Sequence, residues 1–513
     1  MSGSSAANGS AASNAMADPK RWWALAVIAI ATLMVVLDAT IVNVALPHAQ
    51  ADLGISIANR QWVVTAYTLP FGGLLLLGGR IADFNGRKRL FLIGLVGFAI
   101  SSAVGGASVD QGMLFAARAF QGAFAALLSP ASLSLLNVAF NDKRERTVAF
   151  GVYGSVLGAG SAIGLIAGGL LTEYVDWRWC LYVNVPLAAI AFVGALPMIT
   201  ESHSDTRPRY DIPGSVLVTA GLVLLVYGFA EAVSSSWGSS TTVGVLIGGG
   251  VLLIAFVAVQ IRSRNPLLPL RVVMDRNRGG AYLSSLLIFL AMMGMFLFLT
   301  YYLQGVLAYS ALKTGLAMLP LACVVILASG SMAGLMRVVS PRYLISVSFL
   351  ICAVALLWFS QIGTADDYVG HVLGPEIVVG LGIGGILVPA TNLALLGVSG
   401  RDSGVASGLV SAAQQVGGSI GTALLNTVAA TTAAAYLVSH HPAGATAHLT
   451  IAKGTVHGYS VGFLVAAGIF AAGAVFSLAL LNASAKDAAG AGIATVDIDM
   501  PVPGRTSSPS AAR

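Results

Sequence analysis

The stretch GGRIADFNGRKR, residues 78–89, places five charged residues among twelve in a chain that is only 9% charged and 57% hydrophobic. Soluble globular domains contain about 25% charged residues, so this composition is typical of a membrane protein. The runs LPFGGLLLL before the stretch and LFLIGLVGFAI after it are long and do not alternate. A chain in lipid must form helices or a closed barrel, and such runs favour helices. The charged stretch is therefore predicted to be a short hairpin connection between two spans.

Fourteen apolar runs in the chain are long enough to cross a bilayer as helices. We interpret the first run as a retained span and not as a signal peptide, because no small-residue cleavage site follows it. The predicted spans are 23–46, 62–79, 90–108, 113–137, 147–171, 179–199, 212–232, 242–261, 280–303, 314–336, 343–360, 371–397, 405–434 and 458–481.

The positions of the basic residues predict which side each connection faces. Most of the 27 Lys and Arg residues fall in the tails or in connections on the same side as the N-terminus. Arg60, Arg178, Lys313 and Lys453 fall on the other side. Cytoplasmic connections are enriched in Lys and Arg, so both termini are predicted to be cytoplasmic. The net charge of +6 follows from this asymmetry, and no soluble domain is large enough to bind nucleic acid.

Within the charged stretch, Gly79 and Gly86 are predicted to allow the tight turn. The basic residues 87–89 anchor the cytoplasmic side, but Asp83 adds nothing to orientation. The order of glycine, acidic residue, glycine and basic run instead resembles the loop signature of the major facilitator superfamily. The residues that carry this resemblance, and that we expect to form a conformational latch, are Gly79, Arg80, Asp83, Gly86, Arg87 and Lys88.

The resemblance extends over most of the chain, in strings similar to those of the drug:proton antiporter branch with fourteen spans. These are LDATIVNVALP (37–47), QWVVTAYTL (61–69), RAFQGAFAA (118–126), DWRWCLYVNVP (176–186), YYLQGVLAYSALKTGLAMLP (301–320) and SGLVSAAQQVGGSIGTALL (407–425). The family implies an all-α fold of two six-helix bundles with an extra central helix pair. GLMRVVSPR (334–342), where a second copy of the loop signature should stand, has no acidic residue.

The implied divisions of the chain follow from this architecture and from the composition of its ends. The two tails are rich in Ala, Gly, Ser and Pro and are predicted to be disordered. The divisions are the N-terminal tail (1–20), the N-terminal bundle (21–200), the extra pair with its flanking loops (201–279), the C-terminal bundle (280–482) and the C-terminal tail (483–513).

GAGSAIGLIAGG, residues 158–169, resembles the antiporter signature of the family's fifth span. It has Leu165 where the family usually has proline. Spacing by four places three of its glycines on one helix face, which allows a neighbouring helix to approach closely. Plain helix packing and an antiporter element are both open explanations. The glycines concerned are Gly160, Gly164, Gly168 and Gly169.

Three ionisable residues, Asp38, Arg118 and Glu376, lie inside predicted spans. A charge in the bilayer costs about 3 kcal/mol or more, so each is a functional candidate. Their positions along the helices place them in one layer of the outer half, and we expect Arg118 to pair with Asp38. A buried carboxylate beside an arginine can exchange a proton between conformations, so the three are predicted to couple proton movement to transport. The alternatives are a structural ion pair for Asp38, an interfacial arginine for Arg118 and interfacial exposure for Glu376.

The resemblance implies a proton-coupled exporter of drugs or antibiotics, working by alternating access with drug moving out and protons moving in. An exporter or flippase of an endogenous lipid or metabolite on the same fold is the alternative. The expected setting is a bacterial inner membrane, with the protein as a monomer, an amphiphilic small-molecule substrate and a proton gradient in place of a cofactor. The expected substrate cavity is lined by Tyr67, Met292, Phe296 and Gln414.

Other classes of protein are disfavoured by the absence of their sequence motifs. The chain has no zinc-binding helix signature, nucleophile elbow or phosphate-binding glycine loop, so we expect neither an enzyme nor an ATP-driven pump. No filter-like segment repeats, which disfavours a channel. The histidines of the predicted outer loop, 435–457, lack acidic or cysteine partners, so no metal site is predicted.

SGRDSGVASG, residues 399–408, begins a long span of the second half and offers Asp402 or Ser403 as a helix N-cap. A helix N-terminus carries about half a positive charge and stabilises a nearby carboxylate. We therefore expect Asp83 to dock there when the cavity is open outward. Arg87 or a basic residue of 141–146 is expected to hold it from the other side.

Overall fold

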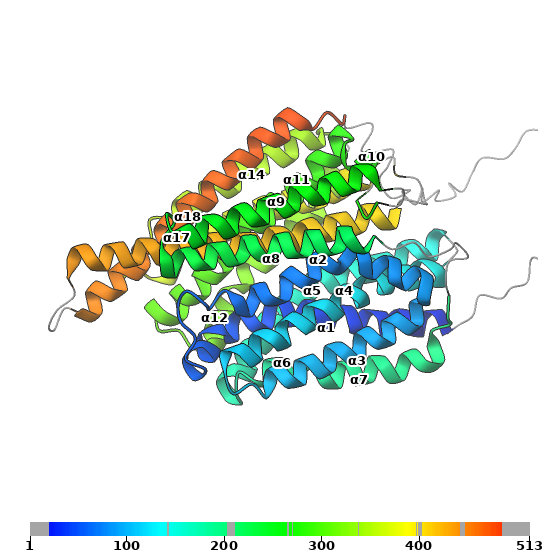
Figure 1. Cartoon of the computed structure of the whole chain (residues 1–513), viewed down its shortest axis with the longest axis horizontal. Helices are drawn as coiled ribbons and strands as arrows, with labels where there is room; N and C mark the ends of the chain where they lie inside the picture. The colour runs from blue at the N-terminus through cyan, green and yellow to red at the C-terminus, as the bar shows by residue number, and fades with distance from the viewer. Residues whose placement is uncertain are drawn as a thin grey trace, which may run out of the picture.

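The computed structural model describes residues 20–140, 143–202, 211–263, 266–268, 270–336, 338–396, 398, 403–441 and 447–484. In these residues every regular element is a helix (Figure 1). The helices are α1 (Lys20–Asp52), α2 (Trp62–Asn85), α3 (Arg87–Gly106), α4 (Gln111–Ala139), α5 (Lys143–Tyr174), α6 (Trp179–Tyr182), α7 (Asn184–Met198), α8 (Ile212–Ser235), α9 (Ser240–Arg262), α10 (Leu270–Val273), α11 (Arg276–Tyr301), the π-helix η1 (Tyr302–Val306), α12 (Ala311–Ala317), α13 (Leu319–Leu335), α14 (Pro341–Phe359), α15 (Tyr368–His371), α16 (Leu373–Leu395), α17 (Ser403–His440) and α18 (Ala447–Leu480).

The described residues contain fourteen helical spans long and apolar enough to cross a membrane, which confirms the predicted number. An even number of spans returns the chain to the side where it starts. Figure 1 shows the start of α1 and the end of α18 at the same end of the molecule. We call this end the proximal side, and the opposite end, where α1 ends and α18 begins, the distal side. The all-helical membrane fold expected from composition is confirmed.

The spans form two bundles with a helix pair against the seam between them (Figure 1). In the first bundle α4 packs against α2 and α3, and α1 packs against α5 and α7. In the second, α11 packs against α17 and α18, and α14 packs against α16 and α18. Helix α8 packs on α9 and contacts both α2 and α17. The apolar cluster at this seam consists of Leu69, Leu222, Val226 and Ala423.

Two glycines allow α2 and α4 to approach closely. A Cβ atom at Gly78 would lie 2.1 Å from the carbonyl oxygen of Ala126. A Cβ atom at Gly122 would lie 2.1 Å from the carbonyl oxygen of Tyr67. No side chain fits at either position without moving a backbone. This contact brings the face of α4 that carries Arg118 against α2.

The predicted hairpin at 78–89 is wrong in its extent. Helix α2 runs to Asn85 and α3 begins at Arg87, so Gly86, with φ of 102°, is the single residue between them. The carboxylate of Glu201 accepts the amides of Lys88 and Arg89, both at 3.0 Å. Because Glu201 satisfies these first-turn amides of α3, the helix starts inside the charged stretch and not after it.

The predicted outer loop at 435–457 is also wrong in its extent. Helix α17 continues to His440 and α18 begins at Ala447, and the pair projects beyond the other helices in Figure 1. The His440 ring stacks on Tyr436 with 3.9 Å between ring centroids. The predicted spans end at 434 and begin again at 458, but the helices continue through AYLVSH (435–440) and AHLTIAKGTVH (447–457).

Candidate functional site

Asp38 on α1 and Arg118 on α4 form an ion pair inside the first bundle. The Nη1 atom of Arg118 lies 2.6 Å from Oδ2 of Asp38, and the two residues are 1% and 0% exposed. Interfacial exposure therefore does not explain Arg118. Removing either partner would leave the other charge buried without compensation, which makes the pair sensitive to substitution.

Neutral amides complete the shell around the Asp38 carboxylate. Its Oδ1 atom accepts hydrogen bonds from Nε2 of Gln121 and Nδ2 of Asn184, both at 2.8 Å. Both amides also donate to the hydroxyl of Ser102 at 2.9 Å, and that hydroxyl donates to the carbonyl of Leu181. The guanidinium of Arg118 and the two amides all donate to the Asp38 carboxylate, an arrangement that suits an ionised carboxylate.

Arg118 is held by further contacts from α2 and from its own helix. Its Nε donates to the carbonyl of Val63 at 3.0 Å, and its Nη1 donates to Oε1 of Gln121 at 2.8 Å. The guanidinium carbon lies 4.4 Å from the ring centroid of Tyr67, which is 1% exposed. The site therefore joins α1, α2, α4 and α7, and a movement between these helices changes the surroundings of the carboxylate.

Glu376 on α16 is the third sequence candidate, and it lies in the second bundle. It is 0% exposed, so interfacial exposure does not explain it. Its Oε2 atom lies 3.0 Å from the hydroxyl of Tyr368, and that hydroxyl lies 2.7 Å from the carbonyl oxygen of Ala317. Its Oε1 atom has no hydrogen-bond partner among the described residues. Two of the three candidates are thus brought together, and the third has separate surroundings.

The glycines of α5 serve two contacts. A Cβ atom at Gly160 would lie 3.0 Å from the Val36 side chain. At Gly164 it would lie 1.9 Å from the hydroxyl oxygen of Thr40, and at Gly168 it would lie 2.9 Å from the carbonyl oxygen of Ile41. These three glycines face α1, as their spacing predicts. A Cβ atom at Gly169 would instead lie 2.6 Å from the Cα of Leu312, on α12 of the second bundle.

Leu165, where the family pattern has proline, lies at the same junction between bundles. Leu165 is 3% exposed. A Cβ atom at Gly315 of α12 would lie only 2.3 Å from the Leu165 carbonyl oxygen. Next to it, the Glu173 carboxylate accepts the amide of Leu312 at 2.9 Å. The distal part of α5 is therefore packed directly on α12.

The charged stretch makes contacts on the proximal side. Arg80 donates to the carbonyl of Pro266, and Nζ of Lys88 donates to the carbonyl of Leu196 at 2.7 Å. The side chain of Asp83 and the whole of Asp402 lie outside the described residues. The expected docking of Asp83 on α17 therefore stays a prediction.

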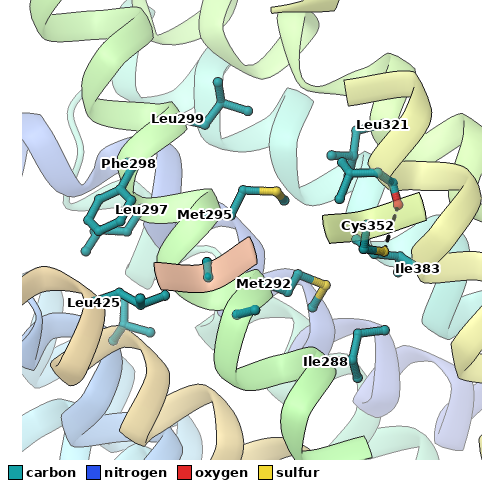
Figure 2. Close-up of a cluster of buried hydrophobic side chains, with 14 of the residues drawn as sticks. Ile288, Met292, Met295, Leu297, Phe298, Leu299, Leu321, Cys352, Ile383 and Leu425 are labelled. Carbon is teal, nitrogen blue, oxygen red and sulfur yellow. Dashed lines mark hydrogen bonds between the residues drawn. The ribbon is translucent and has the colours of Figure 1, made fainter. Parts of the chain in front are cut away.

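The residues expected to line a substrate cavity have different surroundings. Met292, 8% exposed, lies with Met295 among Ile288, Cys352 and Ile383 in the apolar core of the second bundle (Figure 2). Phe296 and Gln414 are half-buried. Tyr67 packs under Arg118. A small cavity of about 10 Å³, enough for about one water molecule, lies beside Arg118 and is lined mainly by apolar residues, including Leu46, Leu114 and Trp177.

Gln121, Asn184 and Ser102 were not among the residues singled out from the sequence. The signal for Gln121 is its spacing of three from Arg118, which places both on one helix face. Asn184 is a polar residue at the start of an apolar run. Nothing in the sequence places Ser102 in this network, because its hydrogen bonds to Gln121 and Asn184 join different helices.

Comparisons with known proteins agree with this architecture. A sequence model described as the Major Facilitator Superfamily matches residues 28–422. A puromycin resistance protein of Streptomyces alboniger is 48% identical over 93% of this chain and 95% of its own. A cephamycin export protein of Amycolatopsis lactamdurans is 39% identical over 79% of this chain and 84% of its own.

The fold is also found in solved structures. A bacterial homologue of the human lysosomal transporter Spinster, in an inward-facing and unoccupied conformation, has a TM-score of 0.64 at 14% identity. The match covers 92% of this chain and 98% of that chain. Two bundles of membrane-spanning helices, the family match and these similarities lead to one conclusion: the chain belongs to the Major Facilitator Superfamily and is a multi-pass membrane transporter.

Proposed function

We propose that the chain is a proton-coupled exporter of amphiphilic small molecules, including antibiotics, in the cytoplasmic membrane of a bacterium. The relatives at 48% and 39% identity, a puromycin resistance protein and a cephamycin export protein, support the direction and the substrate class. The observation that carries proton coupling is the buried ion pair of Asp38 and Arg118. Burying a titratable pair inside membrane spans is costly, and this cost favours a functional role for the pair.

The proximal side is proposed to be cytoplasmic, because most basic residues of the connections lie there. In the structure the bundles contact each other on the distal side. Gln304 of η1 donates to the carbonyl of Val44 at 2.9 Å, and Glu173 accepts the Leu312 amide. These contacts support a state in which substrate enters from the cytoplasm. Export then requires the distal contacts to open.

In the proposed mechanism Asp38 is ionised in this state, because Arg118 and two amides stabilise the charge. When the helices move and the guanidinium withdraws, a buried carboxylate favours its neutral form and takes up a proton. A cationic or polar substrate bound near Asp38 favours the ionised carboxylate and so releases the proton. The proton and the substrate are thus coupled, because each binds with different affinity to the two conformations of the protein.

Glu376 is proposed to be a second proton carrier. The Tyr368 hydroxyl has one hydrogen and two neighbours that accept, the carbonyl oxygen of Ala317 and the carboxyl of Glu376. Both contacts are satisfied when Tyr368 donates to Ala317 and a protonated Glu376 donates to Tyr368. The proposed exporter therefore holds a proton in the second bundle while the carboxylate in the first bundle is ionised.

The gradient supplies enough energy for this exchange. Each elementary charge that crosses the membrane yields about 2.3 kcal/mol per 100 mV, before the pH difference is counted. The tenfold accumulation of a substrate needs about 1.4 kcal/mol. One proton per cycle thus supports export of a neutral substrate against a concentration gradient. Exchange of one proton for one monovalent cation moves no net charge and is driven by the pH difference.

The test is export in liposomes with an imposed pH gradient, using a panel of dyes, antibiotics and lipids. We expect gradient-driven export by the wild type and none by Asp38→Asn, with substrate binding retained. Asp52→Asn is the matched control, because Asp52 also pairs with an arginine, Arg178 at 2.8 Å, but at the exposed distal surface. Full gradient-driven export by Asp38→Asn would refute the proposal. Movement of lipids alone would assign the alternative function, a lipid exporter.

A further inference from the structure

Arg60 crosses from one bundle into the other on the distal side. It lies in the connection between α1 and α2, yet only 4% of it is exposed. Its side chain extends away from the first bundle and is buried among residues of α11, α17 and α18. A charged side chain of a surface connection is normally solvated, so this burial calls for an explanation.

The guanidinium of Arg60 is enclosed by three residues of the second bundle. Its carbon atom lies 4.1 Å from the ring centroid of Tyr301 and 5.8 Å from that of Tyr459. Its Nε donates to Oδ1 of Asn426 at 2.8 Å, and its Nη1 donates to the hydroxyl of Tyr459 at 3.4 Å. We call Tyr301, Tyr459 and Asn426 the tyrosine cage.

The tyrosine cage holds a cation without an anion. In the described part of the chain no acidic side chain is in contact with Arg60, whose partners are ring faces, a phenol and an amide oxygen. Aromatic faces attract cations most strongly when the cation is desolvated. A guanidinium is weakly hydrated, unlike a primary ammonium, so it gives up water readily. The chemistry of the cage therefore suits weakly hydrated organic cations.

Arg60 and the tyrosine cage belong to different bundles, and the two bundles must separate on the distal side during export. All three cage residues are on the second bundle, and Arg60 is on the first. Opening of the distal side withdraws Arg60 and leaves the cage facing the opening. Tyr459 also stacks on Phe298 with 5.3 Å between ring centroids, so its ring stays supported when Arg60 leaves.

We propose that the tyrosine cage is a release-side binding site for the cationic group of a transported amphiphile, and that Arg60 is its resident occupant while the distal side is closed. The inference rests on the proposed export function and names a substrate class, weakly hydrated organic cations. A cationic substrate that fills the cage takes the place of Arg60. By doing so it stabilises the distally open state, in which the cage is free.

The test measures binding of tetraphenylphosphonium to the purified full-length protein in lipid nanodiscs. Tetraphenylborate, an anion of the same shape, is the matched probe. In Arg60→Gln the resident cation is gone, so we expect the dissociation constant of the phosphonium to fall about tenfold and that of the borate to stay unchanged. Arg60→Lys should give a smaller gain than Arg60→Gln, because its ammonium group still competes for the cage but is more strongly hydrated than a guanidinium. Arg178→Gln, which removes another distal arginine, is the control.

A second set of variants tests the cage itself. Adding Tyr301→Leu to Arg60→Gln should cancel the gain in phosphonium affinity, and adding Tyr301→Phe should retain it within about twofold because the ring face remains. The proposal is overturned if Arg60→Gln leaves phosphonium binding unchanged. It is also overturned if both ions bind more tightly, since that indicates general opening, or if Tyr301→Leu has no effect on the gain.

A conformational measurement completes the test and separates it from the exporter proposal. Cysteines at positions 44 and 304, in a protein without Cys180, Cys323 and Cys352, should be joined by a short bifunctional thiol reagent, because the Gln304 side chain reaches the Val44 carbonyl. We expect the phosphonium, and not the borate, to lower this cross-linking several-fold. Export that persists in Asp38→Asn refutes proton coupling but leaves these binding results unaffected. If export is proton-coupled but Arg60 and the phosphonium do not compete for the tyrosine cage, only the cage proposal is refuted.

Discussion

Asp38 and Glu376 are both fully buried carboxyl groups in membrane spans, one in each bundle, and they are bonded in opposite ways. Asp38 receives one guanidinium and two amide donors. Glu376 meets one phenol, and one of its oxygens has no partner among the described residues. Equal burial therefore does not give equal chemistry. The number of donors around each group differs, and this difference is the basis of our proposal that Asp38 is ionised and Glu376 is neutral.

This contrast also separates structural importance from proton transfer. Losing a donor from the Asp38 shell leaves a buried charge without compensation. Glu376, when protonated, carries no charge and needs only one acceptor. The first bundle should therefore be intolerant of substitution at its carboxylate, whereas the second should tolerate an isosteric amide.

The largest effect is expected from Arg118→Ala. Removing one partner of a buried ion pair typically costs about 3–5 kcal/mol, and here three contacts of the guanidinium are lost as well. We expect the free energy of unfolding to fall by that amount, measured by titration with a denaturing detergent. We also expect gradient-driven export in liposomes to be lost. Wild-type stability with normal export would show that the ion pair is needed neither for folding nor for transport.

A direct comparison of Asp38→Asn and Glu376→Gln should give unequal results. An asparagine at position 38 turns an NH₂ group toward existing donors, and an unsatisfied buried group costs about 1–3 kcal/mol. A glutamine at position 376 donates to the Tyr368 hydroxyl as a protonated Glu376 does, so we expect a change in unfolding free energy below about 1 kcal/mol. Equal losses of stability would show that both carboxyl groups are ionised. Proton counting in liposomes should still detect a lower proton to substrate ratio in Glu376→Gln.

The sequence predicts the positions of the two carboxyl groups but not their different partners, because a polar residue in an apolar span is conspicuous. Asp38, Arg118 and Glu376 were found this way, and helix rise placed the first two at similar depth. The fourteen spans follow from hydropathy for the same reason. The helix ends at Asn85 and His440 were not predicted, since a hydropathy window measures the apolar run and not the helix.

The partners of each carboxyl group could not be predicted, because they come from other helices. Asn184 meets Asp38 only when α7 packs against α1, and Ser102 joins the network through Asn184 only when α3 packs against α7. Tyr368 precedes Glu376 by eight residues, but Val372, with φ of −109° and ψ of −47°, separates α15 from α16. Helical periodicity therefore does not place the phenol beside the carboxyl group. The decisive difference between the two sites is a matter of tertiary packing.

A smaller effect is expected from Tyr368→Phe, which removes the only hydrogen-bond partner found for Glu376 in the described residues. The ring can remain, but the Glu376 carboxyl and the Ala317 carbonyl both lose a partner. A buried group without a partner costs about 1–3 kcal/mol, and a water molecule that replaces the phenol would reduce this. We expect a loss in unfolding free energy at the lower end of that range. A smaller loss in a Glu376→Leu background than in the wild type would confirm that the two side chains act as a unit.

The smallest effect concerns Asp367, which positions Tyr368 from the distal surface. Asp367 caps α15 by accepting the amide of Gly370 at 3.1 Å, and this hydrogen bond, with a lesser contribution from His371, lowers the pKa of its carboxyl. A lowered pKa means that the cap is fully formed above the ordinary carboxyl pKa of about 3.9 and weakens as the pH falls through the lower folded value. We expect hydrogen exchange at the Gly370 amide, corrected for the intrinsic rate, to accelerate over that acidic range in the wild type. Asp367→Asn still caps the helix but does not titrate, so its corrected exchange should not change with pH. The same acceleration in the variant would assign the titration to Asp366 or His371, which lie beside it.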